Sequence, residues 1–154
     1  METSLLEVLV KGIPESLLLI LCVYFFCKIK PQGKQLTIIL FVHVVITYLA
    51  RVLLPGYGMT LLINVVVLVI IFNVFLKISM AKVINGALLS ILFVIIAEAI
   101  NFLLIKLVYT GDIETIMADS TKRVIYTIPS TVTLATLVFT IYYLNFIRKS
   151  KKDV

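Results

Sequence analysis

The stretch "VINGALLSILFVIIAEAINFLLIKLV", residues 83–108, decides the fold class of this chain. Only two of its side chains, Glu98 and Lys106, are ionisable. The hydrocarbon core of a bilayer is about 30 Å thick, and an α-helix needs about 20 apolar residues to cross it. The stretch is long enough and apolar enough for this, so it predicts a membrane-spanning helix.

Four further apolar runs lie elsewhere in the chain of 154 residues. With the first they predict five transmembrane spans, at about residues 5–27, 35–54, 59–76, 83–108 and 124–146. Connections such as "KIKPQGK" and "PGYG" are short and carry the Pro and Gly of turns. The expected fold class is all-α, a polytopic membrane protein in which residues 1–154 form a single transmembrane helical domain.

One alternative concerns residues 1–13. "METSLLEVLVKG" has Leu5, Val8 and Leu9 at helical spacing, which also fits a helix that lies along the membrane surface. The topology is the same in both cases.

The composition agrees with lipid as the main solvent. Hydrophobic residues make up 62% of the chain and charged residues 14%, with a mean hydropathy of +1.17. Soluble domains have about 45–50% apolar and about 25% charged residues. The net charge of +6 does not indicate nucleic-acid binding, because the charges cluster at the ends of the apolar runs.

The basic residues also predict an orientation. One side of the membrane receives nine of the fourteen, with the single acid Asp153: Lys28, Lys30, Lys34, Lys77, Lys82, Arg148, Lys149, Lys151 and Lys152. The other side receives most of the acids: Glu2, Glu7, Asp112, Glu114 and Asp119. Cytoplasmic loops are enriched in Lys and Arg. We therefore expect a multi-pass protein of the cell (plasma) membrane with its N-terminus outside and its C-terminus in the cytoplasm.

Three ionisable residues inside the predicted spans fall at nearly one depth. Counted from the nearest cytoplasmic lysine at ~1.5 Å per residue, Glu15 lies roughly 20 Å, Arg51 roughly 25 Å and Glu98 roughly 24 Å from the inner side. Ionisable groups in a bilayer usually face protein or water. These three side chains are therefore expected to form a polar layer in the outer leaflet.

Two interpretations of this layer stay open. In one, Arg51 pairs with Glu15 or Glu98 and fixes helix packing. In the other, the three residues line an outward-facing polar pocket for a ligand. Two carboxylates and one guanidinium leave one acid unpaired, and such an acid is either protonated or meets a cationic ligand.

Other intramembrane polar residues are expected to serve helix packing: His43, Asn64, Asn73 and Asn101. No GxSxG, HExxH, GxGxxG or CxxC motif occurs, and the spacing of Cys22 and Cys27 is not that of a metal site. No catalytic residue, metal or cofactor is therefore expected.

The first and fifth spans share a short pattern, "GIPES" at 12–16 and "TIPST" at 127–131. Both prolines are expected at the outer start of an inward-running helix, where Pro needs no N–H partner. A following Glu15 or Ser130 is favourable near the positive end of the helix dipole. The match is too short to indicate an internal repeat.

The layout resembles the membrane sensor region of AgrC-like and sporulation-type receptor histidine kinases. The resemblance covers about residues 5–147 and is carried by "IPES", the outer Pro-Gly turn "PGYG" and "RVIYTIPS". It implies a bacterial membrane bundle that detects an extracellular peptide or small ligand and acts on a membrane or cytoplasmic signalling partner. No kinase domain follows "NFIRKSKKDV". The resemblance therefore implies either a stand-alone sensor-like module or the membrane part of a kinase without its output domain.

The expected function is that of a non-enzymatic integral membrane protein, a sensory, regulatory or partner-binding module with an outer-leaflet polar pocket. Two alternatives stay open: a small transporter, channel or substrate-binding membrane subunit, and a structural accessory subunit of a membrane complex. The lipid bilayer is the expected surroundings, and an oligomer is compatible with the sequence.

If Arg51 has an intramembrane role, Arg51→Ala destabilises the bundle more than Lys122→Ala, which removes a charge near a helix end. Thermal unfolding of the two variants in detergent measures this difference. Equal stability would contradict an intramembrane role for Arg51.

Overall fold

A computed structural model describes residues 8–53, 57–108 and 120–147. These residues form five α-helices flanked by two short π-helices, with no β-strand among them. In chain order the elements are η1 (Val8–Gly12), α2 (Ile13–Phe26), α3 (Gly33–Leu53), α4 (Tyr57–Leu76), α5 (Met80–Val108), α7 (Ser120–Tyr142) and η2 (Tyr143–Ile147). The all-α prediction is confirmed. Helices α3, α4, α5 and α7 match expected spans within a few residues, whereas α2 begins at Ile13, well after the expected start at about residue 5, and η1 precedes it.

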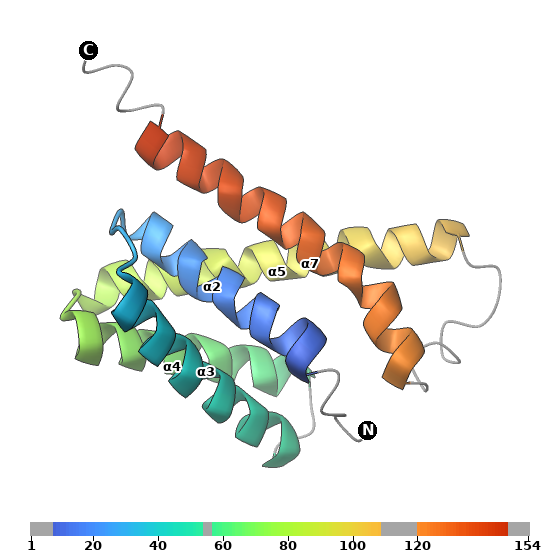
Figure 1. Ribbon diagram of the computed structural model, residues 1–154, viewed down its shortest axis with the longest axis horizontal. Coiled ribbons are helices and arrows are strands. Elements are labelled where there is room, and N and C mark those ends of the chain that lie inside the picture. The colour runs from blue at the N-terminus through green and yellow to red at the C-terminus, as the bar shows by residue number, and fades with distance from the viewer. Residues whose placement is uncertain (1–7, 54–56, 109–119, 148–154) are drawn as a thin grey trace.

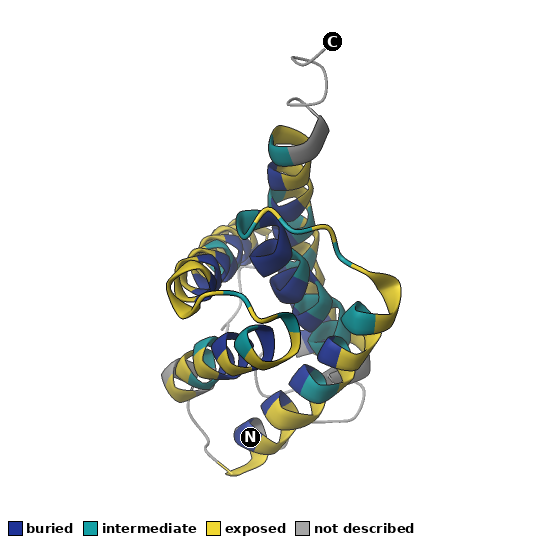
Figure 2. Ribbon diagram, turned by 90° about the vertical axis from the view of Figure 1, so that its left-hand side faces the viewer, coloured by how far each residue is buried: buried dark blue, intermediate teal, exposed yellow. Residues whose placement is uncertain are grey.

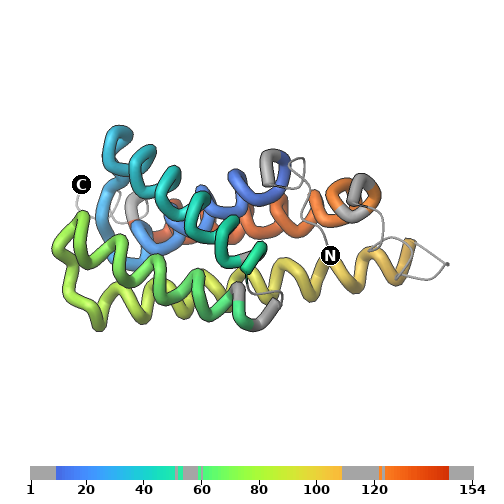
Figure 3. Tube along the Cα trace, turned by 90° about the horizontal axis from the view of Figure 1, so that it is seen from below, coloured from blue at the N-terminus to red at the C-terminus, as the bar shows by residue number. Residues whose placement is uncertain are grey.

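The helices form an antiparallel bundle with α2 at its centre. Short connections join α2 to α3 and α4 to α5, so the members of each pair run in opposite directions (Figure 1). Helix α2 packs against α3, α5 and α7, while α4 packs against α3 and α5. In Figure 1, α3 and α4 lie on the lower side of the bundle and α7 on the upper side, and seen from below α4 and α5 run along one edge (Figure 3). Helix α5 also packs against α7, so α2 and α5 each contact three of the other four helices.

The hydrophobic core is concentrated on α2. Seven apolar side chains of its middle and end are buried: Leu18, Leu19, Ile20, Cys22, Val23, Tyr24 and Phe25. Aromatic pairs join α2 to three neighbours: Tyr24 to Phe72 of α4, with ring centroids 4.9 Å apart, Phe25 to Tyr142 of α7 at 5.1 Å, and Phe26 to Phe93 of α5 at 5.7 Å. Such pairs contribute about 0.5–1.5 kcal/mol beyond their buried area. The C-terminal half of α2 is therefore a closely packed apolar column.

The outer faces of the helices are apolar and exposed (Figure 2). Phe41, Leu62 and Leu107 are 70%, 63% and 81% exposed. Three helical segments are long and apolar enough to cross a membrane, namely Gly33–Ala50, Met80–Val108 and Val124–Asn145, and Leu61–Leu76 is a shorter apolar helix. Monomeric soluble proteins rarely expose contiguous apolar surface of this extent. Lipid is the solvent that fits it, and the chain is a membrane protein.

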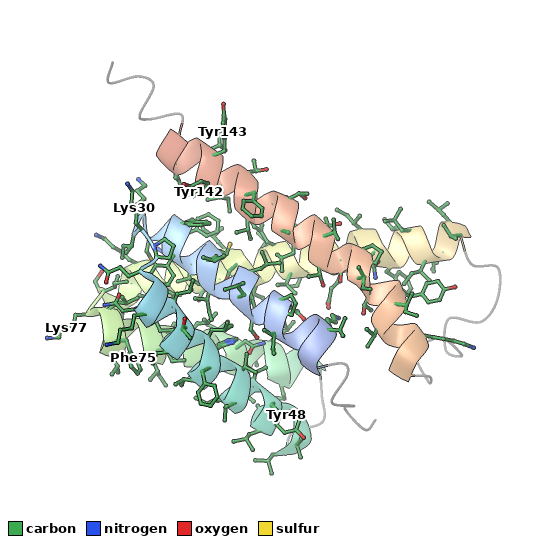
Figure 4. All side chains as sticks on the ribbon, in the orientation of Figure 1. Lys30, Tyr48, Phe75, Lys77, Tyr142 and Tyr143 are labelled. Carbon is green, nitrogen blue, oxygen red and sulfur yellow. The ribbon has the colours of Figure 1, made fainter. Side chains whose placement is uncertain are left out.

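Five exposed lysines lie at one end of the bundle: Lys28, Lys30, Lys34, Lys77 and Lys82. Figure 4 labels Lys30 and Lys77 there, and the chain segments that carry the five contain no acid (Figure 4). Lys28 follows the end of α2 with φ 58°, and Lys77 follows α4 with φ 51°. Glycine is the usual residue in this left-handed conformation, and other residues adopt it at a cost of about 1–2 kcal/mol. A lysine at this position, unlike a glycine, places a positive charge beside the negative C-terminal end of the helix.

Polar side chains link the helices inside the bundle. The Thr47 hydroxyl on α3 donates to Asn64 Oδ1 on α4 at 2.9 Å, and both residues are buried. His43 on α3 is completely buried. Asn73 differs from the expected helix-bridging residues, because its Nδ2 donates to the Ile78 carbonyl at 3.0 Å and closes the turn between α4 and α5.

Asn64→Ala is expected to lower the free energy of unfolding by about 1 kcal/mol, because it leaves the buried Thr47 hydroxyl without its acceptor. Asn85→Ala is the matched control, since Asn85 is an exposed asparagine in a helix. Asn85→Ala is expected to change the free energy of unfolding by no more than about 0.5 kcal/mol. Unfolding in mixed micelles measures both. An Asn64→Ala variant as stable as the control would contradict the Thr47–Asn64 contact.

Candidate functional site

A polar pocket lies where α2, α5 and α7 meet. Helix α2 contributes Glu15, while α5 and α7 contribute three residues each to its lining: Val94, Ala97, Glu98, Ser130, Thr131 and Leu134. Glu15 and Glu98, which the sequence places at similar depth, thus come together in one pocket. The structure places the third member of the expected layer, Arg51, in α3, and its side chain lies outside the described part of the chain.

The pocket coincides with irregularities in two of the three helices. Helix α2 is preceded by the π-helical turn η1 and has Pro14 in its first turn, directly before Glu15. Helix α7 has Pro129 in its interior, directly before Ser130, and the helix bends along its length (Figure 1). π-helical turns occur frequently at functional sites, and an interior proline kinks a helix.

The position of Pro129 corrects the expectation that this proline marks a helix start. Helix α7 begins at Ser120, so Pro129 lies well inside it. An interior proline removes the hydrogen bond to the carbonyl four residues earlier, here that of Ile125. The shared "GIPES" and "TIPST" pattern therefore corresponds to a helix start in α2 and to a kink in α7.

Polar side chains satisfy the backbone around this kink. Asn101 Nδ2 on α5 donates to the Tyr126 carbonyl at 3.0 Å, next to the carbonyl that Pro129 leaves without its helical donor. The Ser130 hydroxyl donates to the Thr127 carbonyl at 2.7 Å. In lipid, freed backbone groups in a kinked helix are satisfied by neighbouring helices and by Ser and Thr side chains. Asn101 thus links α5 to α7, as expected for a helix-packing residue.

Glu98 of the pocket lining forms an ion pair that the sequence did not predict. Lys11 Nζ in η1 lies 3.5 Å from Glu98 Oε1 in α5, and the two side chains are 17% and 26% exposed. The sequence predicted Arg51 as one candidate partner of Glu15 or Glu98, and its side chain lies outside the described residues, whereas Lys11 was expected near the outer water. The spacing of four residues between Lys11 and Glu15 is the signal that was available, since residues i and i+4 share a helix face.

Glu15 is the other carboxylate of the pocket. Its Oε2 atom is buried and has no hydrogen-bond partner among the described residues. Buried polar atoms in proteins are nearly always hydrogen-bonded, so each exception requires an explanation. The ionisable residues in the lining are Glu15 and Glu98, and Lys11 lies beside the pocket as a partner of Glu98.

The pocket is small. Its cavity volume is about 10 Å³, which is room for about one water molecule. Among the described residues, no group of three or more His, Cys, Asp and Glu side chains is arranged to hold a metal ion. The geometry therefore fits a ligand the size of water and does not fit a peptide.

No protein-family model, no curated protein and no solved structure matches the chain. What the pocket does is therefore inferred from its own residues and geometry.

A double-mutant cycle tests the ion pair. Lys11→Gln and Glu98→Gln are expected to show a coupling of about 1 kcal/mol in the free energy of unfolding, because each removes the partner of a mostly buried charge. Lys106→Gln is the control: Lys106 is on α5, with Nζ 4.9 Å from the centroid of the Phe102 ring, and does not line the pocket. A Lys11–Glu98 coupling no larger than the Lys106–Glu98 coupling would contradict the pair.

Proposed function

We propose that this chain is a non-enzymatic multi-pass protein of the plasma membrane that acts as a sensory or regulatory module. The pocket between α2, α5 and α7 is its ligand site, and the lysine-rich end of the bundle faces its partner. The observation that carries this proposal is the close apolar packing of α2 between the pocket and the lysine-rich end.

This packing is mainly aliphatic and aromatic. Beyond Glu15, the core side of α2 consists of the buried column that ends at Phe25, and the Tyr24–Phe72 and Phe26–Phe93 pairs seal it against α4 and α5. A channel or transporter needs polar groups along a path through the membrane. No residue that lines the pocket belongs to this column, and the Tyr24 hydroxyl is a buried polar atom within it. This supports binding at one end rather than conduction through the bundle.

Helix α2 also provides a connection between the two ends. Its N-terminal turn carries Glu15, and its C-terminal end is held by side-chain contacts from two other elements. Cys27 Sγ donates to the Lys82 carbonyl of α5 at 3.7 Å, and Asn145 Nδ2 of η2 donates to the Phe25 carbonyl at 3.1 Å. A shift of α2 caused by a ligand at Glu15 therefore changes contacts beside the exposed lysines.

The partner in this proposal is a membrane or cytoplasmic signalling protein, as the resemblance to AgrC-like sensor regions implies. The lysine-rich end is then cytoplasmic by the positive-inside rule. A small ligand fits the pocket volume better than an extracellular peptide does.

Two assays on the full chain test the proposal. Reconstituted into liposomes, the protein is expected to give no ion or solute flux above that of protein-free vesicles. Cross-linking in native membranes is expected to capture a partner, with a yield that Glu15→Gln changes several-fold and Asn85→Ala does not change. Flux that depends on the protein, together with recovery of the chain alone, would contradict a sensory module.

A further inference from the structure

We propose that the lysine-rich end of the bundle binds the phosphate groups of anionic phospholipids through the ammonium groups of Lys28, Lys30, Lys34, Lys77 and Lys82. This binding goes beyond the proposed function, because it requires only that the chain lies in a bilayer. A signalling partner at the same end would meet the protein together with these lipids.

The two connections at this end share one arrangement, a lysine followed by an isoleucine. Lys28 and Lys77 each follow a helix end in the left-handed conformation, and both are exposed. The next residue of each connection, Ile29 or Ile78, packs against the hydrophobic core. The isoleucine thus anchors the backbone of each connection, while the lysine stays at the surface.

Hydrogen bonds hold both anchors in place. The Ile29 N–H donates to the Tyr24 carbonyl of α2 at 2.9 Å. The Ile78 carbonyl accepts from Asn73 Nδ2 of α4 at 3.0 Å. The backbone beneath the lysines is therefore fixed before any ligand binds, which lowers the cost of ordering on binding.

The two connections also meet. Cys27 Sγ, between α2 and α3, donates to the Lys82 carbonyl at the start of α5 at 3.7 Å. Figure 4 shows Lys30 and Lys77 at the same end of the bundle (Figure 4). The lysines of both connections therefore belong to one charged surface.

This surface lies at the depth of lipid headgroups. Only residues 27–32 separate α2 from α3, and only residues 77–79 separate α4 from α5. Connections this short keep the lysines beside the ends of the apolar helices. Tyr142 and Tyr143 lie at the same end and are 38% and 51% exposed (Figure 4). Tyrosine is enriched at the membrane–water interface, so the tyrosines and the lysines indicate the same depth.

Charge complementarity favours an anionic ligand. The acidic residues of the described part of the chain are Glu15 and Glu98, and both line the pocket instead of this surface. Anionic lipids supply negative charge at headgroup depth, and clusters of about 4–8 basic residues beside membrane helices bind them. The lysine ammonium is a point charge that commonly binds phosphate.

The surface next to the lysines favours a lipid over an acidic protein segment. Val74 and Phe75, in the last turn of α4 before Lys77, are 64% and 49% exposed. A phospholipid covers this apolar surface with its acyl chains while its phosphate reaches the ammonium group. An acidic segment of a protein matches the lysines alone.

The test uses the full chain in phosphatidylcholine vesicles that contain a trace of spin-labelled lipid. Electron paramagnetic resonance measures the fraction of labelled lipid that the protein immobilises. Spin-labelled phosphatidylglycerol is expected to associate several-fold more strongly than spin-labelled phosphatidylcholine. The preference is expected to decrease as salt is added, because salt screens exposed charges.

Variants show whether the lysines carry the preference. Replacing all five with glutamine is expected to abolish it. The double variant Lys28→Gly with Lys77→Gly is expected to remove much of it without loss of Tm, because glycine adopts the left-handed conformation readily. Lys28→Arg with Lys77→Arg keeps the charge and is expected to keep the preference. Lys106→Gln, near the other end of α5, is expected to leave it unchanged.

Equal association of the two labelled lipids with the wild type would overturn the inference. A preference that persists in the variant without the five lysines would also overturn it. Equal lipid association together with a partner cross-link that this variant loses would assign the surface to an acidic protein. The dependence of the cross-link on Glu15 tests the proposed function separately, so the failure of one proposal is distinguishable from that of the other.

Discussion

Lipid cannot hydrogen-bond to the polar groups of a helix bundle, and this constraint shapes the rest of the structure. Each buried polar side chain has to find its partner inside the protein. Thr47 bonds to Asn64 between α3 and α4, Asn101 bonds to the Tyr126 carbonyl between α5 and α7, and Lys11 pairs with Glu98. Glu15 stands out against this background, because a buried oxygen of its carboxylate has no such partner among the described residues.

The pocket and the departures from regular helix belong together. In a regular helix the backbone N–H and C=O groups hydrogen-bond to one another. At η1 and at the kink at Pro129 the regular helix is interrupted, and side chains from α5 interact with these segments. Toward the lysine-rich end the same helices return to close apolar packing, with Tyr24 against Phe72 as the clearest contact. A polar pocket backed by an apolar column is suited to binding a ligand at one end, while α2 connects that end to the other.

The sequence predicted the helices from the length of the apolar runs, and from the rise per residue it predicted that Glu15 and Glu98, which line one pocket, lie at similar heights. Apolar runs of sufficient length gave the spans, and counting from Lys28 and Lys82 placed Glu15 and Glu98 at similar heights. The rotation of each helix about its axis was not predictable, since apolar residues surround most of these helices on every side. Lys11 was therefore missed as the partner of Glu98. The start of α7 was placed too late, because the polar residues after Ser120 do not resemble a membrane span.

Hydrogen exchange of the full chain in nanodiscs tests the central claim most directly, since it observes whether α2 connects the pocket to the lysine-rich end. Glu15→Gln is expected to change the exchange of the backbone amides of Cys27, Lys28 and Ile29, which hydrogen-bond to the last turn of α2. Lys106→Gln, which does not line the pocket, is expected to leave them unchanged. Equal exchange of these amides in Glu15→Gln and in the wild type would contradict a connection through α2.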